Sequence, residues 1–306
     1  MTMDFYIWKD RRCVYDAIQG GESPALLLIH PIGVGLSRAF WQPFIEAWAN
    51  KGNPAPIYNP DLLGCGDSDM VKAAYPPQAW ADQLAYFIEK VVEGPVVLVV
   101  QGALLPVAVK LMEMPVSNRV AGLALSGPPA WPLMSTDTAG WKVNLIWQLF
   151  SSPLGSGFYR YARRESFLRS FSERQLFEQA EDVSDDWLTM LHKGSRNMDS
   201  RYAVFSFLAG FWRQDYSGAI ARIQQPVMII MGEEASTIDR KVAKQADKQP
   251  KKSSENRLQD YLDHFPRAQG VSIAGRNVLP YESTSEFVQV VQSFLSDVEK
   301  ASASNA

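Results

Sequence analysis

The stretch between Gly94 and Met112, GPVVLVVQGALLPVAVKLM, limits most strongly what this chain can fold into. Its run from Val96 to Val100 contains only valine and leucine, which is typical of a strand buried on both faces of a parallel sheet. Gly102 then gives the backbone the freedom that a tight turn requires. The pattern from Ala103 to Met112 is helical. Its one proline, Pro106, is tolerated because it falls within the first turn. We therefore predict a strand, a sharp turn and a helix, the repeating unit of an α/β fold.

Other apolar runs add strands to the same sheet. The alternating segments Phe5 to Trp8 and Cys13 to Ile18 flank a charged turn and predict an antiparallel hairpin at a sheet edge. Buried strands are predicted at 25–29, 57–61, 120–125, 226–231 and 270–274. Amphipathic segments at 40–50, 80–92 and 284–298 predict helices. The expected fold is a mostly parallel central sheet with an N-terminal antiparallel hairpin and helices on both faces.

One long segment interrupts this alternation of strands and helices. Residues 128–225 are helical in pattern and rich in aromatic side chains, among them Trp131, Trp141, Trp147, Trp187 and Trp212. We predict a core domain from residues 1–127 and 226–300, a helical lid from residues 128–225 and a disordered tail at 301–306. The aromatic side chains of the lid are expected to pack it onto the core.

Charge and cysteine content argue against several classes of function. A formal net charge of −3 and a pI of about 5.7 give no electrostatic reason to expect a nucleic-acid partner. Cys13 and Cys65 lie far apart without the spacing of a zinc site or a disulfide framework, and we expect no metal and no cofactor. The chain has neither the apolar core of a signal peptide nor a stretch that could span a membrane. A cytoplasmic location is therefore expected.

A lysine-rich stretch follows the predicted strand at 226–231. The segment from Asp239 to Arg257 is hydrophilic and carries few acidic residues. Its lysines are Lys241, Lys244, Lys248, Lys251 and Lys252. A solvated insertion is the simpler interpretation, and docking to an acidic partner or peripheral association with an anionic membrane surface is the alternative.

The order of the strand ends resembles the α/β-hydrolase superfamily over nearly the whole chain. LLLIH at 26–30, PDLLGCGDSD at 60–69 and VVLVVQGALLP at 96–106 carry this resemblance. HPIGVGLS at 30–37 and NVLPYES at 277–283 are similar to members from cyanobacteria and plastids. The resemblance implies a lid over the strand ends and a pocket with an oxyanion loop. The residues expected there are His30, Pro31, Ile32, Gly33, Gln101, Gly102 and Ala103.

Enzymes of this superfamily use a nucleophile, an acid and a histidine, in that order along the chain. The turn after the strand at 96–100 normally reads G-x-S-x-G, and here Gly102 stands in the place of the nucleophile. Ala235 stands where the acid is expected, and Val278 where the histidine is expected. No serine, threonine, cysteine or aspartate lies between 94 and 112, so a shifted register restores no nucleophile. The resemblance thus implies a degenerate triad and a loss of hydrolase activity.

Three histidines remain as candidate bases. His264 precedes the last strand and His192 belongs to the lid, and both are expected to be structural. His30 lies in the oxyanion loop. A pair of His30 with Asp61 or Gln101 is the one constellation that retains acid–base chemistry.

Two functional interpretations fit these residues. The first is a non-hydrolytic protein that binds an apolar small molecule under its lid, or that docks a protein partner through the lid and the basic stretch. The second is a hydrolase or lyase with an unorthodox site that uses His30 and a bound water. A closed apolar cavity would favour a ligand, whereas an exposed aromatic patch would favour a partner.

Overall fold

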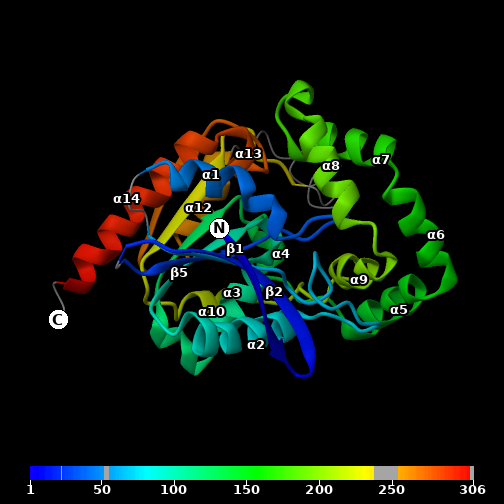
Figure 1. Ribbon diagram of the computed structural model, residues 1–306, viewed down its shortest axis with the longest axis horizontal. Helices are drawn as coiled ribbons and strands as arrows, with labels where there is room; N and C mark the ends of the chain where they lie inside the picture. The colour runs from blue at the N-terminus through cyan, green and yellow to red at the C-terminus, as the bar shows by residue number, and fades with distance from the viewer. Residues whose placement is uncertain (22, 52–54, 238–253, 304–306) are drawn as a thin grey trace.

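The computed structural model of this chain describes residues 1–21, 23–51, 55–237 and 254–303. Its described strands form one eight-stranded sheet in the order β1-β2-β4-β3-β5-β6-β7-β8 (Figure 1). The strands are β1 (Thr2–Trp8), β2 (Arg11–Ile18), β3 (Ala25–Ile29), β4 (Ile57–Pro60), β5 (Val96–Gln101), β6 (Val120–Ser126), β7 (Val227–Gly232) and β8 (Ala268–Ile273). β2 pairs antiparallel with β1 and β4, and every other pair is parallel. The predicted sheet and its N-terminal hairpin are confirmed.

Helices connect the strands and close the chain. They are α1 (Gln42–Ala49), α2 (Pro77–Phe87), α3 (Leu105–Met112), α4 (Trp131–Met134), α5 (Gly140–Ser151), α6 (Pro153–Ala162), α7 (Glu165–Phe171), α8 (Asp185–Gly194), α9 (Arg201–Ala209), α10 (Ser217–Ile220), α12 (Ser254–Leu262), α13 (Leu279–Glu282) and α14 (Thr284–Ala303). Because α14 continues to Ala303, the predicted tail is wrong for residues 301–303, and 304–306 lie outside the described residues. Within the described ranges, every helix is too short or too polar to span a bilayer.

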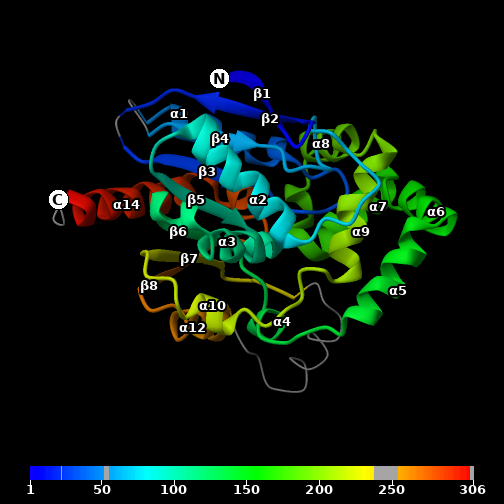
Figure 2. The ribbon, with the colours of Figure 1, turned by 90° about the horizontal axis from the view of Figure 1, so that it is seen from below.

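Helices cover both faces of the sheet (Figures 1 and 2). α2 and α3 pack on one face, and α1 and α14 pack on the other. Strand β5 shows the cause, because its side chains alternate between the two faces. Leu98 contributes to the cluster under α2 and α3, whereas Val97 and Val99 contribute to the cluster under α1 and α14. Both faces of the strand are buried, as its run of valine and leucine predicts.

The segment between β6 and β7, here called the cap, carries α4 to α10 and lies largely beyond one end of the sheet (Figure 1). It meets the core where α8 crosses the loop after β3. A Cβ atom added to Gly35 of that loop would lie 1.9 Å from the carbonyl oxygen of Leu191, so the two backbones touch. Trp187 of α8 is fully buried against Phe40 and Tyr281 of the core. The expected packing of the cap aromatics holds for Trp187 but is wrong for Trp141, which is 67% exposed. The predicted bounds of the two domains stay predictions.

Candidate functional site at the strand ends

The turn between β5 and α3 has the shape of a nucleophile elbow. β5 ends at Gln101, and Gly102 follows with a φ of +59°, in the left-handed region. The short 3₁₀ turn Gly102–Leu104 then leads into α3, which has its proline in the first turn. A Cβ atom added to Gly102 would meet no other atom within 4 Å. The turn therefore has room for a side chain at this position, although glycine occupies it.

Two further turns converge on this elbow, so that three turns meet at one place. The side-chain amide of Gln101 donates a hydrogen bond to the backbone oxygen of Asn277, in the turn after β8, at 2.8 Å. The side-chain amide of Asn277 donates to the hydroxyl of Ser236, in the turn after β7, at 3.2 Å. Gln101, Asn277 and Ser236 each directly adjoin one of the positions Gly102, Val278 and Ala235. The structure thus brings these positions to one place through their neighbours.

The turn after β8 is also fixed by a carboxylate. Glu282 accepts hydrogen bonds from the backbone N–H groups of Arg276 at 3.0 Å and Val278 at 3.1 Å. A third donor, the N–H of Glu178 at 2.6 Å, belongs to the cap. Burial raises the pKa of Glu282, while these donors act to lower it. The carboxylate therefore holds the backbone of the turn, and the side chain of Val278 is buried in the core.

The cap reaches the same turn with its own backbone. The N–H of Asn277 donates to the carbonyl of Leu176 at 3.1 Å, and its side-chain amide donates to the carbonyl of Gln175 at 2.7 Å. Both acceptors lie in a short helical turn of the cap. The cap is thus hydrogen-bonded onto the turn that carries the histidine in the resembled enzymes.

His30 is a fixed and neutral part of the loop after β3. Its Nε2 accepts a hydrogen bond from the N–H of Leu62 at 3.1 Å, so Nδ1 carries the proton and donates to the carbonyl of Pro31 at 2.8 Å. The ring is fully buried, and this burial lowers the pKa of His30 to about 4. Both nitrogens are therefore engaged by backbone groups that hold two loops together.

Asp61 is engaged elsewhere. Its carboxylate accepts hydrogen bonds from the N–H groups of Arg38 and Asp67, each at 2.8 Å, and also pairs with the Arg38 guanidinium. Arg38 in turn bridges to Asp16 and Asp67, each at 2.9 Å. Burial raises the pKa of Asp61, and the positive charge of Arg38 opposes that rise. In the described structure no hydrogen bond joins His30 to Asp61 or Gln101, so the predicted constellation is not assembled.

The remaining histidines and Cys65 form no catalytic pair among the described residues. His264 stacks on Trp131 with ring centroids 3.8 Å apart, and His192 is exposed on the cap. Cys65 is buried, and this burial raises the pKa of its thiol. Across the described parts of the chain, no three His, Cys, Asp or Glu side chains are grouped to hold a metal ion. The lysines between 241 and 252 lie outside the described residues.

Three polar residues at the site, Ser236, Asn277 and Glu282, were not predicted from the sequence. Their positions in the sequence could have indicated them. Ser236 and Asn277 adjoin the assigned acid and histidine positions, and Glu282 lies about one helical turn after Val278. Two buried oxygens there, Oε1 of Gln101 and Oγ of Ser126, have no hydrogen-bond partner among the described residues. Buried oxygens of this kind are acceptors for water or for a polar ligand group.

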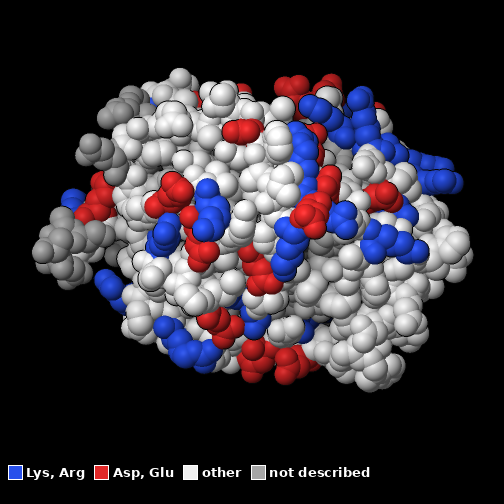
Figure 3. Space-filling view, turned by 60° about the horizontal axis from the view of Figure 1, so that its bottom comes forward, with Lys and Arg blue, Asp and Glu red and all other residues white. Residues whose placement is uncertain are grey.

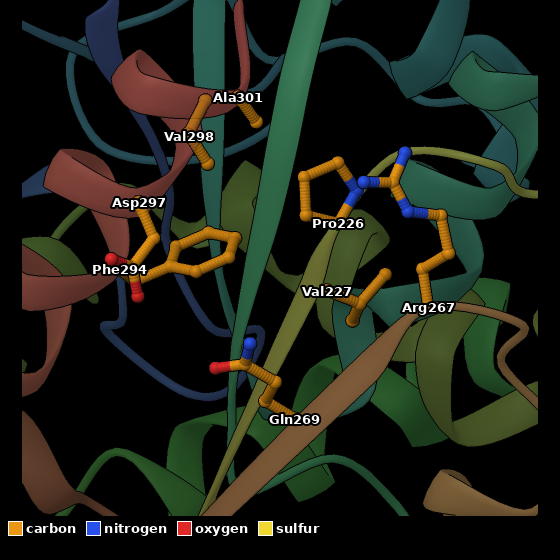
Figure 4. A pocket seen from close by; sticks show the side chains of 8 residues that line it. All are labelled: Pro226, Val227, Arg267, Gln269, Phe294, Asp297, Val298 and Ala301. Atoms are coloured by element: carbon orange, nitrogen blue, oxygen red, sulfur yellow. The ribbon is translucent and has the colours of Figure 1, made fainter. Parts of the chain in front are cut away.

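A small cavity of about 160 Å³ lies at the opposite edge of the sheet (Figure 4). Phe294 and Asp297 of α14 face Val227 and Arg267 across it. Val227 begins β7, whereas Gly102 follows the end of β5. β5, β6 and β7 run parallel, so the start of one strand and the end of another lie at opposite ends of the sheet. This cavity is therefore separate from the converging turns.

The family follows from a match to a family model. A model of the alpha/beta hydrolase family matches residues 26–290. This chain belongs to that family. A search of curated proteins finds no match to the sequence.

Several solved structures share the fold of this alpha/beta hydrolase family chain. An esterase from Thermogutta terrifontis superposes with a TM-score of 0.69 and 17% identity, with 94% of each chain covered. Cfl2 from Burkholderia cenocepacia gives 0.71 and 16%, with 96% of this chain and 95% of that chain covered. An esterase from Exiguobacterium antarcticum gives 0.69 and 14%, with 94% and 96% covered. At these identities the similarity shows the fold alone.

Proposed function

We propose that this chain is a non-hydrolytic member of the alpha/beta hydrolase family that acts by binding. One observation carries the proposal: the hydrogen bonds from Gln101 to Asn277 and from Asn277 to Ser236 draw together the three turns that hold a triad in enzymes of this fold. The side chains at the three triad positions are a hydrogen, a methyl and an isopropyl group. Acyl transfer requires a nucleophile, a base and an orienting acid there.

The consequence for rate is large. Removing one member of a Ser-His-Asp triad lowers kcat by roughly 10⁴- to 10⁶-fold, and what remains comes from the oxyanion hole and from binding. Replacing all three leaves no group to form or break an acyl intermediate. The chain is therefore expected to turn over esters at most weakly.

The geometry of His30 argues against the alternative of an enzyme with an unorthodox site. A general base needs a free nitrogen and a pKa near the working pH. Both ring nitrogens of His30 are engaged by backbone groups, and burial lowers its pKa to about 4. The imidazole would have to give up its bond to Leu62 and leave its buried site before it accepted a proton from water.

The cap favours a partner over a ligand enclosed at the strand ends. Trp141 and its apolar neighbours on α5 face outward, which is the exposed aromatic surface expected of a docking protein. The proposal has three further parts. They are a relationship to cyanobacterial and plastid members, a cytoplasmic location, and a docking role for the lysines at 241–252.

An ester panel tests the proposal. Short-chain and long-chain p-nitrophenyl esters are incubated with the wild type, with His30→Ala and with His192→Ala as a matched control on the exposed cap surface. We expect turnover near the uncatalysed rate for all three proteins. Turnover by the wild type and His192→Ala that His30→Ala abolishes would instead establish the enzyme with a His30 site.

A further inference from the structure

The consecutive cap helices α5 and α6 share an exposed apolar surface, called here the cap face. Trp141, Leu145 and Leu149 are spaced four residues apart on α5, so they follow one side of that helix. The exposed large apolar side chains of α5 and α6 that define the cap face, each between 37% and 72% exposed, are Trp141, Leu145, Ile146, Leu149, Leu154, Phe158 and Tyr161. A group of large apolar side chains exposed side by side on a folded domain is typical of a binding surface.

The main packing contacts of α5 and α6 come from side chains on their inward sides. The inward side of α5 contacts α9, where Phe150 stacks on Phe205 with ring centroids 4.7 Å apart and Trp147 packs near Tyr202 at 6.2 Å. Tyr159 of α6 is fully buried against Phe205. Two outer rings also make contacts within the cap, because Phe158 lies 6.3 Å from Phe205 and Tyr161 lies 5.3 Å from Phe167. Both rings nevertheless remain at least 42% exposed, so the outer surface is accessible to a partner.

Basic side chains adjoin the cap face. Arg160, Arg163 and Arg164 line an open groove of about 420 Å³ together with His192 and Met198. Among the described residues, none of these arginines forms an ion pair with a carboxylate, and Arg163 donates to the backbone oxygen of Arg196 at 3.4 Å. Figure 3 shows a broad surface without charge at this end of the molecule, with Lys and Arg side chains along one side of it.

The charge of this segment differs from that of the whole chain. Residues 138–164 contain Lys142 and the three groove arginines but no aspartate or glutamate, although the chain as a whole has a net charge of −3. Asp137 and Glu165 bound this segment, so the charge within it is basic while single acidic residues flank it. An exposed aromatic and aliphatic helix face with mainly basic charge beside it fits the boundary between the headgroups and the acyl chains of an anionic bilayer.

We propose that the cap face binds the surface of a bilayer that contains anionic lipids. The apolar side chains of α5 and α6 enter the acyl boundary, and the groove arginines contact lipid phosphates. Trp141 and Tyr161 have the amphipathic rings that favour this depth. The proposal rests on the proposed binding function, because it names the partner of the cap.

Charge favours a bilayer over a second copy of this chain. A symmetric dimer through the cap face would offer the arginines of each subunit the same surface of the other subunit, and residues 138–164 contain no carboxylate that could pair with them. A cation that an interface leaves without an opposite charge weakens that interface. An anionic surface neutralises them instead.

Vesicle sedimentation tests this proposal. Phosphatidylcholine vesicles with and without phosphatidylglycerol are mixed with the wild type, with Trp141→Ser/Leu149→Ser, and with Arg160→Gln/Arg163→Gln/Arg164→Gln. We expect the wild type to sediment with the anionic vesicles and poorly with the neutral ones. Since each basic residue near the surface contributes about 1 kcal/mol, the arginine variant should bind roughly 100-fold more weakly, and the apolar variant about tenfold or more.

Matched controls carry the same changes on other surfaces. Lys51→Gln/Lys72→Gln/Lys90→Gln removes three exposed positive charges, and Phe5→Thr/Ile7→Thr removes two exposed apolar side chains of β1. Both controls should bind like the wild type. Thermal unfolding checks that each variant is folded. As a second measurement, brominated lipids should quench the fluorescence of Trp141 in the wild type, and Trp141→Phe should lose this part of the quenching. This measurement does not depend on the folding of the double variant.

The proposal is overturned by a wild type that ignores anionic vesicles, or by controls that lose as much binding as the cap variants. A dimer that Trp141→Ser/Leu149→Ser dissolves, without vesicle binding, would assign the cap face to self-association. Ester turnover with intact vesicle binding would overturn the non-hydrolytic function alone, so the two proposals fail separately.

Discussion

Gly102 and Gly35 show how differently two glycines with positive φ constrain this chain. Their φ angles are +59° and +81°. A Cβ atom at Gly102 would enter open space, whereas one at Gly35 would collide with the backbone of Leu191. The conformation costs an L-residue about 1–2 kcal/mol in both cases, but only Gly35 adds a steric clash between core and cap.

We therefore predict that Gly102→Ala lowers the free energy of unfolding by about 1 kcal/mol, and Gly35→Ala by more than about 3 kcal/mol. Urea denaturation of both variants beside the wild type measures the difference. Equal losses would contradict the packing of α8 against the loop after β3.

The open space beside Gly102 also allows a prediction for Gly102→Ser. The variant should fold with a similar loss of about 1 kcal/mol. It should gain no ester turnover, because the described structure places no imidazole against position 102 and Val278 cannot accept a proton. Rapid acylation of the introduced serine by a p-nitrophenyl ester, detected by intact mass, would show that an unassigned base reaches the elbow.

The burial of His30 predicts a pH dependence of stability. The imidazole binds a proton below about pH 6.5 in the unfolded chain but only below about pH 4 in the folded one. Protons therefore favour the unfolded state between these values, and stability that is present above pH 6.5 is lost as the pH falls. The contribution of His30 should drop by about 2 kcal/mol between pH 7 and pH 5.

His30→Gln removes this titration, so its free energy of unfolding should change less than that of the wild type over the same pH range. His192→Gln, on the exposed cap, is the matched control and should keep the wild-type slope. Identical slopes for the wild type and His30→Gln in urea titrations would contradict a buried, neutral imidazole.

At the scale of elements, the turn after β8 is a junction between the core and the cap. The carboxylate of Glu282 accepts hydrogen bonds from two backbone N–H groups of this turn and from the backbone N–H of Glu178 in the cap. Removing the carboxylate leaves these donors without their acceptor.

Glu282→Ala should therefore destabilise the protein by about 2–3 kcal/mol. It should also speed proteolysis of the cap, which this junction helps to hold. Glu233→Ala, which removes an exposed carboxylate at the end of β7, is the control and should change stability by less than about 0.5 kcal/mol. Chemical denaturation and limited proteolysis give the two readouts, and equal effects of both variants would contradict the junction.

Sequence predicted the strands well because burial on both faces leaves a strong signal. β5 and β7 are nearly pure apolar runs, and the structure places both inside the sheet. The hydrogen bond from Gln101 to Asn277 joins residues 176 positions apart, and no local pattern specifies such a contact. Periodicity also does not tell which side of α5 faces the core, and for that reason the prediction for Trp141 is wrong.

At the scale of the whole molecule, a hydrolase fold is combined with Gly102, Ala235 and Val278 at the three turns and with an apolar, basic cap at its end. The eight-stranded sheet holds the three turns together, and neighbouring amide and hydroxyl groups link them. We expect function to reside on the cap face and not at the strand ends.

Labelling with a fluorophosphonate probe, read by intact-protein mass spectrometry, tests the central claim most directly. A functional serine hydrolase of this fold beside it serves as the positive control. We predict that the wild-type chain gains no covalent adduct while the control is labelled stoichiometrically. A stoichiometric adduct on any serine of this chain, abolished by His30→Ala, would contradict the account.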